Sequence, residues 1–179
     1  DVVGSTQLLN RIGAEQMVRL MNECYTGLVE VVLANDGTLD KYTGDGFMAV
    51  FGAPLARADD SRRAVRTALD LLAEVDRFNE SSGQQLALKF GISRGTVVAG
   101  NIGSPRRMEY SVIGPEVAMA SRLCDRARAS EILVSSAVYF ELKDEFEFAP
   151  AGRHSFKHFR DSLEIFRVLG PPGAPDPFR

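Results

Sequence analysis

The stretch from Leu39 to Gly52 carries the residues whose types and spacing are best suited to chemistry. Asp45 stands between Gly44 and Gly46, with an apolar, strand-like run on either side, and this pattern predicts a β-hairpin. The glycines leave little side-chain bulk at the turn, so the Asp45 carboxylate is open to a cation or a phosphate. Alone, however, the three residues also fit an ordinary turn, because aspartate and glycine are common turn residues.

Asp1 is a second carboxylate of interest. The first six residues fit the end of a strand followed by a turn, and because no initiator methionine precedes them we expect a fragment of a longer protein. If the strand that ends at Asp1 lies beside the hairpin, Asp1 and Asp45 converge. Paired carboxylates suit Mg²⁺, whose octahedral coordination is completed by waters and phosphates. Backbone N–H groups that enter a helix could bind those phosphates, and here they come from Val2, Val3, Gly4, Ser5 and Thr6.

The helix expected at 116–127 adds a cation. Its residues Ala118 and Arg122 lie four positions apart, on a face other than the apolar one. A guanidinium keeps its charge and offers a fork of donors, so Arg122 could contact charge that develops on a phosphate. The neighbouring Asp125 and Arg126 fit a solvated charged surface equally well, and spacing alone leaves both interpretations open.

Hydrophobic periodicity predicts the elements that position these residues. Apolar side chains at helical spacing indicate helices at 14–34 and 59–79, and a strand follows at 86–93. With a strand before Asp1, the order is the βαββαβ order of a ferredoxin-like core, an α+β fold with an antiparallel sheet covered by helices. A C-terminal αβ extension is expected from strands and helices at 108–112, 116–127, 132–134, 135–142 and 164–168.

Composition limits the class of protein. The 179 residues are 45% hydrophobic and 25% charged, which is ordinary for a soluble domain, and we assign residues 1–169 to one domain and the Pro/Gly-rich residues 170–179 to a linker or disordered end. A net charge of −3 argues against a nucleic-acid binder. No apolar run approaches the roughly 20 residues of a membrane span, so no membrane contact is expected. Cys24 and Cys124 lack metal-ligand spacing and are expected to be reduced core residues of a cytoplasmic protein.

Several motifs together resemble the catalytic domain of class III nucleotidyl cyclases, in the order of that family and over nearly the whole chain. They are the segments 1–6 (DVVGST), 37–51 (GTLDKYTGDGFMAVF), 91–103 (GISRGTVVAGNIG) and 110–123 (YSVIGPEVAMASRL). The resemblance implies an adenylyl cyclase that converts ATP to cyclic AMP and pyrophosphate. It also implies a head-to-tail homodimer whose sites are shared between two chains, in a protein fused to a regulatory domain.

The resemblance further implies a role for each site residue. Asp1 and Asp45 match the aspartates that bind two Mg²⁺ or Mn²⁺ ions. Lys41 and Ser111 match the two positions that read the base, and lysine at the first of them goes with adenine. The transition-state arginine matches Arg122, and a late lysine that contacts the phosphates matches Lys157.

Three residues depart from the family pattern. Ala118 replaces an asparagine that positions the ribose, Thr96 stands where one subclass carries an arginine, and His158 stands where glycine is common. A degenerate module that binds ATP or dimerises without turnover is therefore one alternative, and a guanylyl cyclase is another. A diguanylate cyclase would need a GG-D/E-E-F signature, and an RNA-recognition module would need exposed sheet aromatics and a basic face. The sequence shows neither feature.

Overall fold

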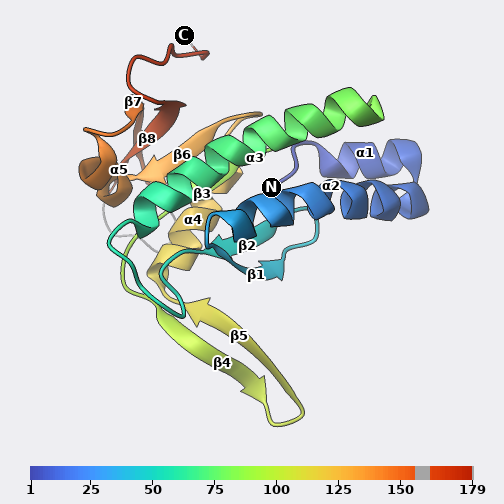
Figure 1. Ribbon diagram of the computed structural model, residues 1–179, viewed down its shortest axis with the longest axis horizontal. Helices are drawn as coiled ribbons and strands as arrows, with labels where there is room; N and C mark the ends of the chain where they lie inside the picture. Colours follow the sequence, from blue (N-terminus) through green and yellow to red (C-terminus); the bar gives the residue numbers. More distant parts are fainter. Residues whose placement is uncertain (156–161, 179) are drawn as a thin grey trace.

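Two long amphipathic helices form the main helical layer. In the computed structural model, which describes residues 1–155 and 162–178, α2 (Ala14–Ala34) and α3 (Asp60–Ser82) lie side by side (Figure 1). A short helix, α1 (Ser5–Ile12), precedes α2, and Gly13 separates the two with a φ of 83°. The buried stripe of α2 has helical spacing, as the sequence predicts, and consists of Met17, Leu20, Met21, Cys24, Leu28 and Val32.

The predicted hairpin is present next to α2. It consists of β1 (Thr38–Tyr42) and β2 (Phe47–Val50), which pair antiparallel. The first residues of the chain lie beside the hairpin turn, since the Val2 N–H donates to the Asp45 carbonyl at 3.0 Å. On its other side Val2 forms an antiparallel bridge with Leu88. Residues 1–3 thus lie between the hairpin turn and residues 87–89, and the strand expected before Asp1 stays a prediction.

A four-stranded sheet completes the core, in the order β3 (Phe90–Ile92), β6 (Ile132–Ser135), β8 (Leu163–Gly170), β7 (Glu147–His154). Helix α4 (Pro115–Arg126) packs against β3 and β6, and α5 (Ser136–Leu142) packs near β6 and β8. The α+β class is confirmed, although β3 and β6 form a parallel pair within the mostly antiparallel arrangement. None of the helices in the described part of the chain is long and apolar enough to cross a membrane.

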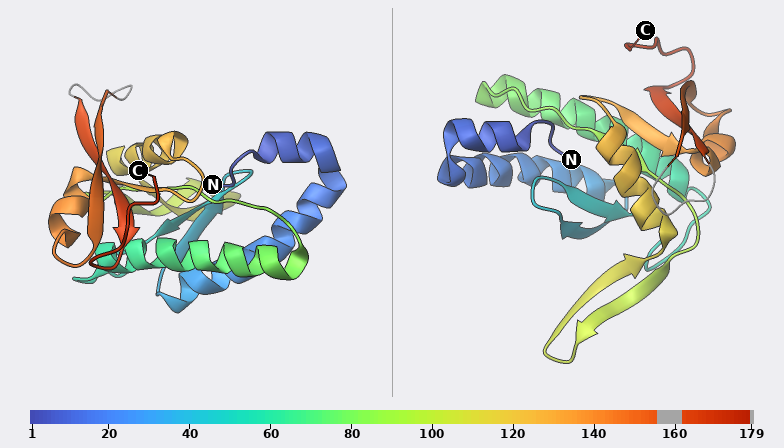
Figure 2. Two further views of the ribbon diagram at one scale, coloured as in Figure 1. Left: turned by 90° about the horizontal axis from the view of Figure 1, so that it is seen from above. Right: turned by 180° about the vertical axis from the view of Figure 1, so that it is seen from behind.

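One hairpin extends away from the rest of the domain. Its strands β4 (Val98–Ser104) and β5 (Arg107–Ile113) pair antiparallel over their whole length, and Figures 1 and 2 show them projecting from the body. The hairpin is longer than the sequence predicts, because the predicted strand in this region covered only 108–112. Its apolar side chains are largely exposed, above all Val98, Ile102, Met108, Tyr110 and Ile113.

The residues after β8 turn back onto the domain. Asp176 lies 3.5 Å from the Arg167 guanidinium, and the Phe178 ring lies 4.6 Å from the carbon at its centre. Arg167 also pairs with Glu131, and both side chains are buried. Gly170 is the last residue of β8, and residues 171–178 form neither helix nor strand. The assignment of residues 170–179 to a linker or disordered end stays a prediction.

Candidate active site

The two predicted metal-binding aspartates meet at the hairpin turn. Besides the bond between Val2 and Asp45, the turn itself is closed by the Thr43 N–H, which donates to the Gly46 carbonyl at 2.9 Å. A Cβ on Gly46 would stand 2.9 Å from Asp1 Oδ1. Asp1 therefore lies directly against the turn that carries Asp45, and only a residue without a side chain fits between them without displacing Asp1.

Two further polar side chains contact these aspartates. The Ser5 hydroxyl donates to Asp45 Oδ2, and the Lys89 ammonium lies 3.5 Å from Asp1 Oδ2. Sequence reasoning assigned Ser5 only a backbone role and did not single out Lys89. The alternation of 86–93 gives no sign that Lys89 faces Asp1, because the pairing of residues 87–89 with residues 1–3 is long-range.

The backbone N–H groups of residues 2–6 divide into two sets. Val2 donates to Asp45 and Val3 donates to the Ala87 carbonyl at 2.8 Å, so the prediction that these two N–H groups bind phosphate is wrong. They are committed to holding the strand in place. Ser5 and Thr6 open α1 behind Gly4, whose φ of 69° is left-handed and whose position has no side-chain cap. The first N–H groups of a helix have no partner within it, so this end remains suited to an anion.

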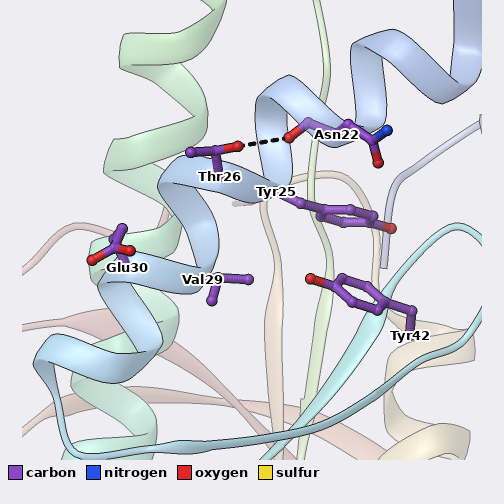
Figure 3. Close-up of a pocket in the computed structure, with 6 residues that line it drawn as sticks. All are labelled: Asn22, Tyr25, Thr26, Val29, Glu30 and Tyr42. Carbon is purple, nitrogen blue, oxygen red and sulfur yellow. Dashed lines mark hydrogen bonds between the residues drawn. The ribbon is translucent and has the colours of Figure 1, made fainter.

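A pocket of about 370 Å³ lies between α2 and β1, where the rings of Tyr25 and Tyr42 lie 4.9 Å apart between centroids, with their planes tilted by 40° (Figure 3). Asn22, Thr26, Val29 and Glu30 complete its lining. The Tyr25 hydroxyl donates to the Gly46 carbonyl at 3.4 Å. Burial, followed by the nearby Asp45 charge, raises the pKa of Tyr25 to about 12. Tyr25 thus supports the aspartate turn from the helix side as a neutral phenol.

The two predicted base-reading residues are joined through a third. Ser111 on β5 donates to Asp40 Oδ2 at 3.0 Å, and the Lys41 ammonium lies 3.4 Å from the same oxygen. The structure therefore brings Lys41 and Ser111 together, as the resemblance implies. Asp40 was not predicted from the sequence.

The remaining predicted residues lie apart from the aspartates. Arg122 on α4 is half-exposed and pairs with Asp125 at 3.4 Å, and within the described residues it makes no hydrogen bond or ion pair with Asp1 or Asp45. Ala118 lies one turn earlier on the same helix and offers no hydrogen-bonding group. Lys157 falls outside the described residues.

The aspartate site suits a hard divalent cation. Asp1 lies against the turn that carries Asp45, and Mg²⁺ is commonly bound through one or two carboxylates with the remainder supplied by waters and substrate phosphates. Within residues 1–155 and 162–178, no group of three or more His, Cys, Asp or Glu side chains could hold a metal ion. The donor set thus fits an ion shared with a phosphate ligand better than a structural metal enclosed by protein.

Comparison with known families identifies the domain. Residues 1–170 match the family described as the adenylate and guanylate cyclase catalytic domain. The chain belongs to this family. The resemblance recognised from the sequence motifs is therefore confirmed, and the aspartate turn lies within the matched region.

Curated relatives of this cyclase domain include two named adenylate cyclases. Adenylate cyclase 1 of Rhizobium meliloti is 32% identical over 176 residues, which are 95% of this chain and 26% of that protein. The adenylate cyclase of Mycobacterium bovis is 30% identical over 177 residues, which are 99% of this chain and 40% of that protein. The cyclase domain thus spans only a minor part of the length of these relatives.

Solved structures share the fold of the cyclase domain closely. The adenylyl cyclase CyaB from P. aeruginosa aligns with a TM-score of 0.92 at 29% identity, covering 98% of this chain and 93% of that one. The guanylyl cyclase Cya2 aligns with a TM-score of 0.90 at 28% identity, covering 100% and 91%. Because structures named for either nucleotide superpose this well, the fold alone does not select the base.

Proposed function

We propose that this domain is an adenylyl cyclase that converts ATP to 3′,5′-cyclic AMP and pyrophosphate. One observation carries the choice: Asp1 and Asp45 meet at an open turn, and the same hairpin presents Lys41 beside Ser111. Lysine is a donor only, which suits the N1 acceptor of adenine. The relatives named as adenylate cyclases support the same choice.

Asp1 and Asp45 would hold two Mg²⁺ or Mn²⁺ ions. When bound, such ions supply positive charge at the triphosphate and lower the pKa of the ribose 3′-hydroxyl, which attacks the α-phosphate. The free N–H groups at the start of α1 bind phosphate oxygens. Arg122 stabilises the charge that develops on the α-phosphoryl group, and loss of such a donor typically costs about 3 kcal/mol, or roughly a hundredfold in rate. Lys157 adds a phosphate contact.

The site is completed by a second copy of the chain, in a head-to-tail homodimer. Among the described residues, Arg122 forms no hydrogen bond or ion pair with Asp1 or Asp45 of its own chain, and it is half-exposed, as a residue that serves a partner would be. The projecting hairpin offers the apolar surface for association, since Val98 and Ile113 are paired across it and are 74% and 60% exposed.

We place the domain in the cytoplasm, which holds ATP and keeps thiols such as those of Cys24 and Cys124 reduced. In the full-length protein we expect fusion to a regulatory domain. The greater length of the relatives supports that expectation.

The direct test is formation of cyclic AMP from ATP with Mn²⁺ or Mg²⁺, with GTP as the competing substrate and Asp45→Ala as the control. Cyclic AMP above that control, with ATP preferred over GTP, is the expected result. Absence of product from either nucleotide contradicts the enzymatic assignment, and a preference for GTP contradicts the assignment of Lys41.

Ala118 favours one second candidate, a module that binds ATP without turnover. It would show ATP binding with no product, and restoration of the family residue by Ala118→Asn would then create activity. For an active enzyme, Ala118→Asn instead raises an activity that is already measurable. The unchanged chain alone therefore separates the two candidates.

Shared sites predict complementation. Asp45→Ala is expected to be inactive alone, and Arg122→Ala is expected to keep only about one hundredth of the wild-type rate. When they are mixed, each mixed dimer contains one site with both residues intact, so random exchange restores about a quarter of the wild-type activity. Absence of any recovery in a mixture shown to exchange subunits contradicts the shared-site arrangement.

A further inference from the structure

Asp40 is a buried acidic residue at an irregular point of β1. The β1–β2 register shifts there, so that Leu39 faces Ala49 and Lys41 faces Met48 while Asp40 is the extra residue of a β-bulge. In a regular strand, successive side chains point to opposite faces. The bulge lets two successive side chains approach each other, and Lys41 Nζ lies 3.4 Å from Asp40 Oδ2.

Ser111 fixes this carboxylate from a different strand. Its hydroxyl donates to Asp40 Oδ2 at 3.0 Å, across 71 positions of sequence, and the whole Ser111 residue is only 4% exposed. The Asp40 side chain is 3% exposed, whereas that of Lys41 is 45% exposed. A base that approaches from outside therefore meets Lys41 first. The Asp40 carboxylate lies behind Lys41, and Ser111 holds that carboxylate from the interior.

Lysine by itself discriminates poorly between the two purines. Its ammonium has three donors on a flexible stem, and it can donate to N1 of adenine or, by a small movement, to O6 of guanine. Selection of adenine therefore requires that the ammonium be held in one place. A negative charge behind it adds a second bias, because adenine carries an amino donor at the position where guanine carries the O6 acceptor.

We propose that Asp40 is a positioning and specificity-determining residue for the nucleotide base, anchored by Ser111 and acting through Lys41. Ser111 then contributes to base selection by fixing Asp40, not by contacting the base from its buried position. The carboxylate that selects adenine comes from the bulge at position 40, next to the lysine that it orients.

The test is a double-mutant cycle of Asp40→Asn, Ser111→Ala and the variant that carries both. For each protein, the measured quantity is the ratio of kcat/KM for ATP to kcat/KM for GTP. Asp40→Asn keeps the shape and removes the charge. We expect the ratio to fall about tenfold, the size of one hydrogen bond to a charged group, mainly through a higher KM for ATP. Ser111→Ala lowers the ratio less, because the ion pair remains, and adds nothing in the Asp40→Asn background. Asp36→Asn is the matched control, since Asp36 is exposed and pairs with Arg57 instead.

A merely structural role for Asp40 would lower kcat for both nucleotides and leave the ratio unchanged, and that result overturns the proposal. A further fall on adding Ser111→Ala to Asp40→Asn overturns the relay, because Ser111 would then act independently. If Asp40→Asn does not fold, Ser111→Ala alone tests the proposal. An unchanged ATP-to-GTP ratio of kcat/KM in Ser111→Ala would then overturn it.

Because this inference rests on the proposed function, the same variants are also titrated with 3′-deoxy-ATP and 3′-deoxy-GTP, which lack the attacking hydroxyl. Absence of cyclic product from the unchanged chain refutes the proposed activity only. The role of Asp40 is then decided by the ratio of the two dissociation constants. An unchanged domain that binds both analogues equally, or not at all, overturns it.

Discussion

At Gly91, strand β3 packs tightly against the helix that carries Arg122. A Cβ on Gly91 would stand 2.0 Å from the Ala120 carbonyl oxygen and 2.3 Å from the Cys124 backbone nitrogen. Both are backbone atoms of α4 and cannot rotate away. Gly91→Ala therefore requires α4 to move off the sheet by about 1 Å or more, since non-bonded carbon contacts lie near 3.5 Å.

This displacement has two measurable costs. Overpacking of a core typically costs about 1–3 kcal/mol, which in a domain of this size lowers Tm by roughly 2–12 °C. Because α4 carries Arg122, the guanidinium moves with the helix, and a misplacement of about 1 Å can reduce the rate roughly a hundredfold. Gly91→Ala should therefore lose activity well beyond its loss of folded protein.

The assay combines urea or thermal unfolding with cyclic AMP formation at a temperature where the variant is folded. Gly100→Ala is the matched control, because the same Cβ on strand β4 meets nothing within 4 Å, and its free energy of unfolding should stay within about 0.5 kcal/mol of the wild type. Unchanged stability of Gly91→Ala refutes the steric reasoning. Lost stability with full activity of the folded fraction refutes the link between α4 placement and Arg122.

Three further predictions concern the surface, the metal site and a buried thiol. Val98→Lys should weaken self-association, measured by sedimentation, because it places a charge on the apolar surface of the projecting hairpin. Phe140→Lys is the control, since Phe140 is 64% exposed on α5, away from the hairpin, and should leave self-association unchanged. Equal effects of the two variants would contradict association through the hairpin. Lys89→Gln should lower the Mn²⁺ concentration for half-maximal activity severalfold, because it removes a cation 3.5 Å from Asp1, and a higher requirement would contradict this. Burial, followed by the charge of a nearby glutamate, raises the pKa of Cys24 from 9.0 to about 11. The unfolded chain therefore loses this proton first, so stability present below pH 9 should decline between pH 9 and 11, less steeply in Cys24→Ala; identical pH profiles would rule out Cys24 as the source.

The sequence predicts best where one periodicity dominates. Helix α2 begins and ends at the predicted residues, 14 and 34, because its apolar stripe is regular and the Asn35-Asp36-Gly37 sequence stops it. The hairpin turn was predicted from Gly44-Asp45-Gly46, and the meeting of Asp1 with Asp45 followed from the expected strand order. These are consequences of local pattern combined with topology.

The missed features break a local pattern or depend on distant contacts. Strand β7 was not predicted, since it contains Pro150 and Gly152 and its register with β8 shifts between Pro150 and Arg153. The long hairpin has no buried face to impose alternation along most of its length. The role of Asp40 could not be predicted, because the alternating pattern of a strand does not reveal where a β-bulge occurs. Its hydrogen-bond partner Ser111 is also 71 positions away in the sequence.

The size of the defect at Ala118 weighs in favour of an enzyme. The missing asparagine would give the ribose one neutral hydrogen bond, whose net value is about 0.5–1.5 kcal/mol, or roughly two- to thirteenfold in rate. A charge-stabilising group such as Arg122 is worth about 3 kcal/mol, and removal of a metal-binding carboxylate would take away both ion and substrate contacts. The chain keeps Asp1, Asp45 and Arg122, and the departure at Ala118 removes only the smaller contribution. A domain that had lost its function would be under no constraint to keep the costly groups in place, so the substitution fits a slower cyclase better than an inactive one.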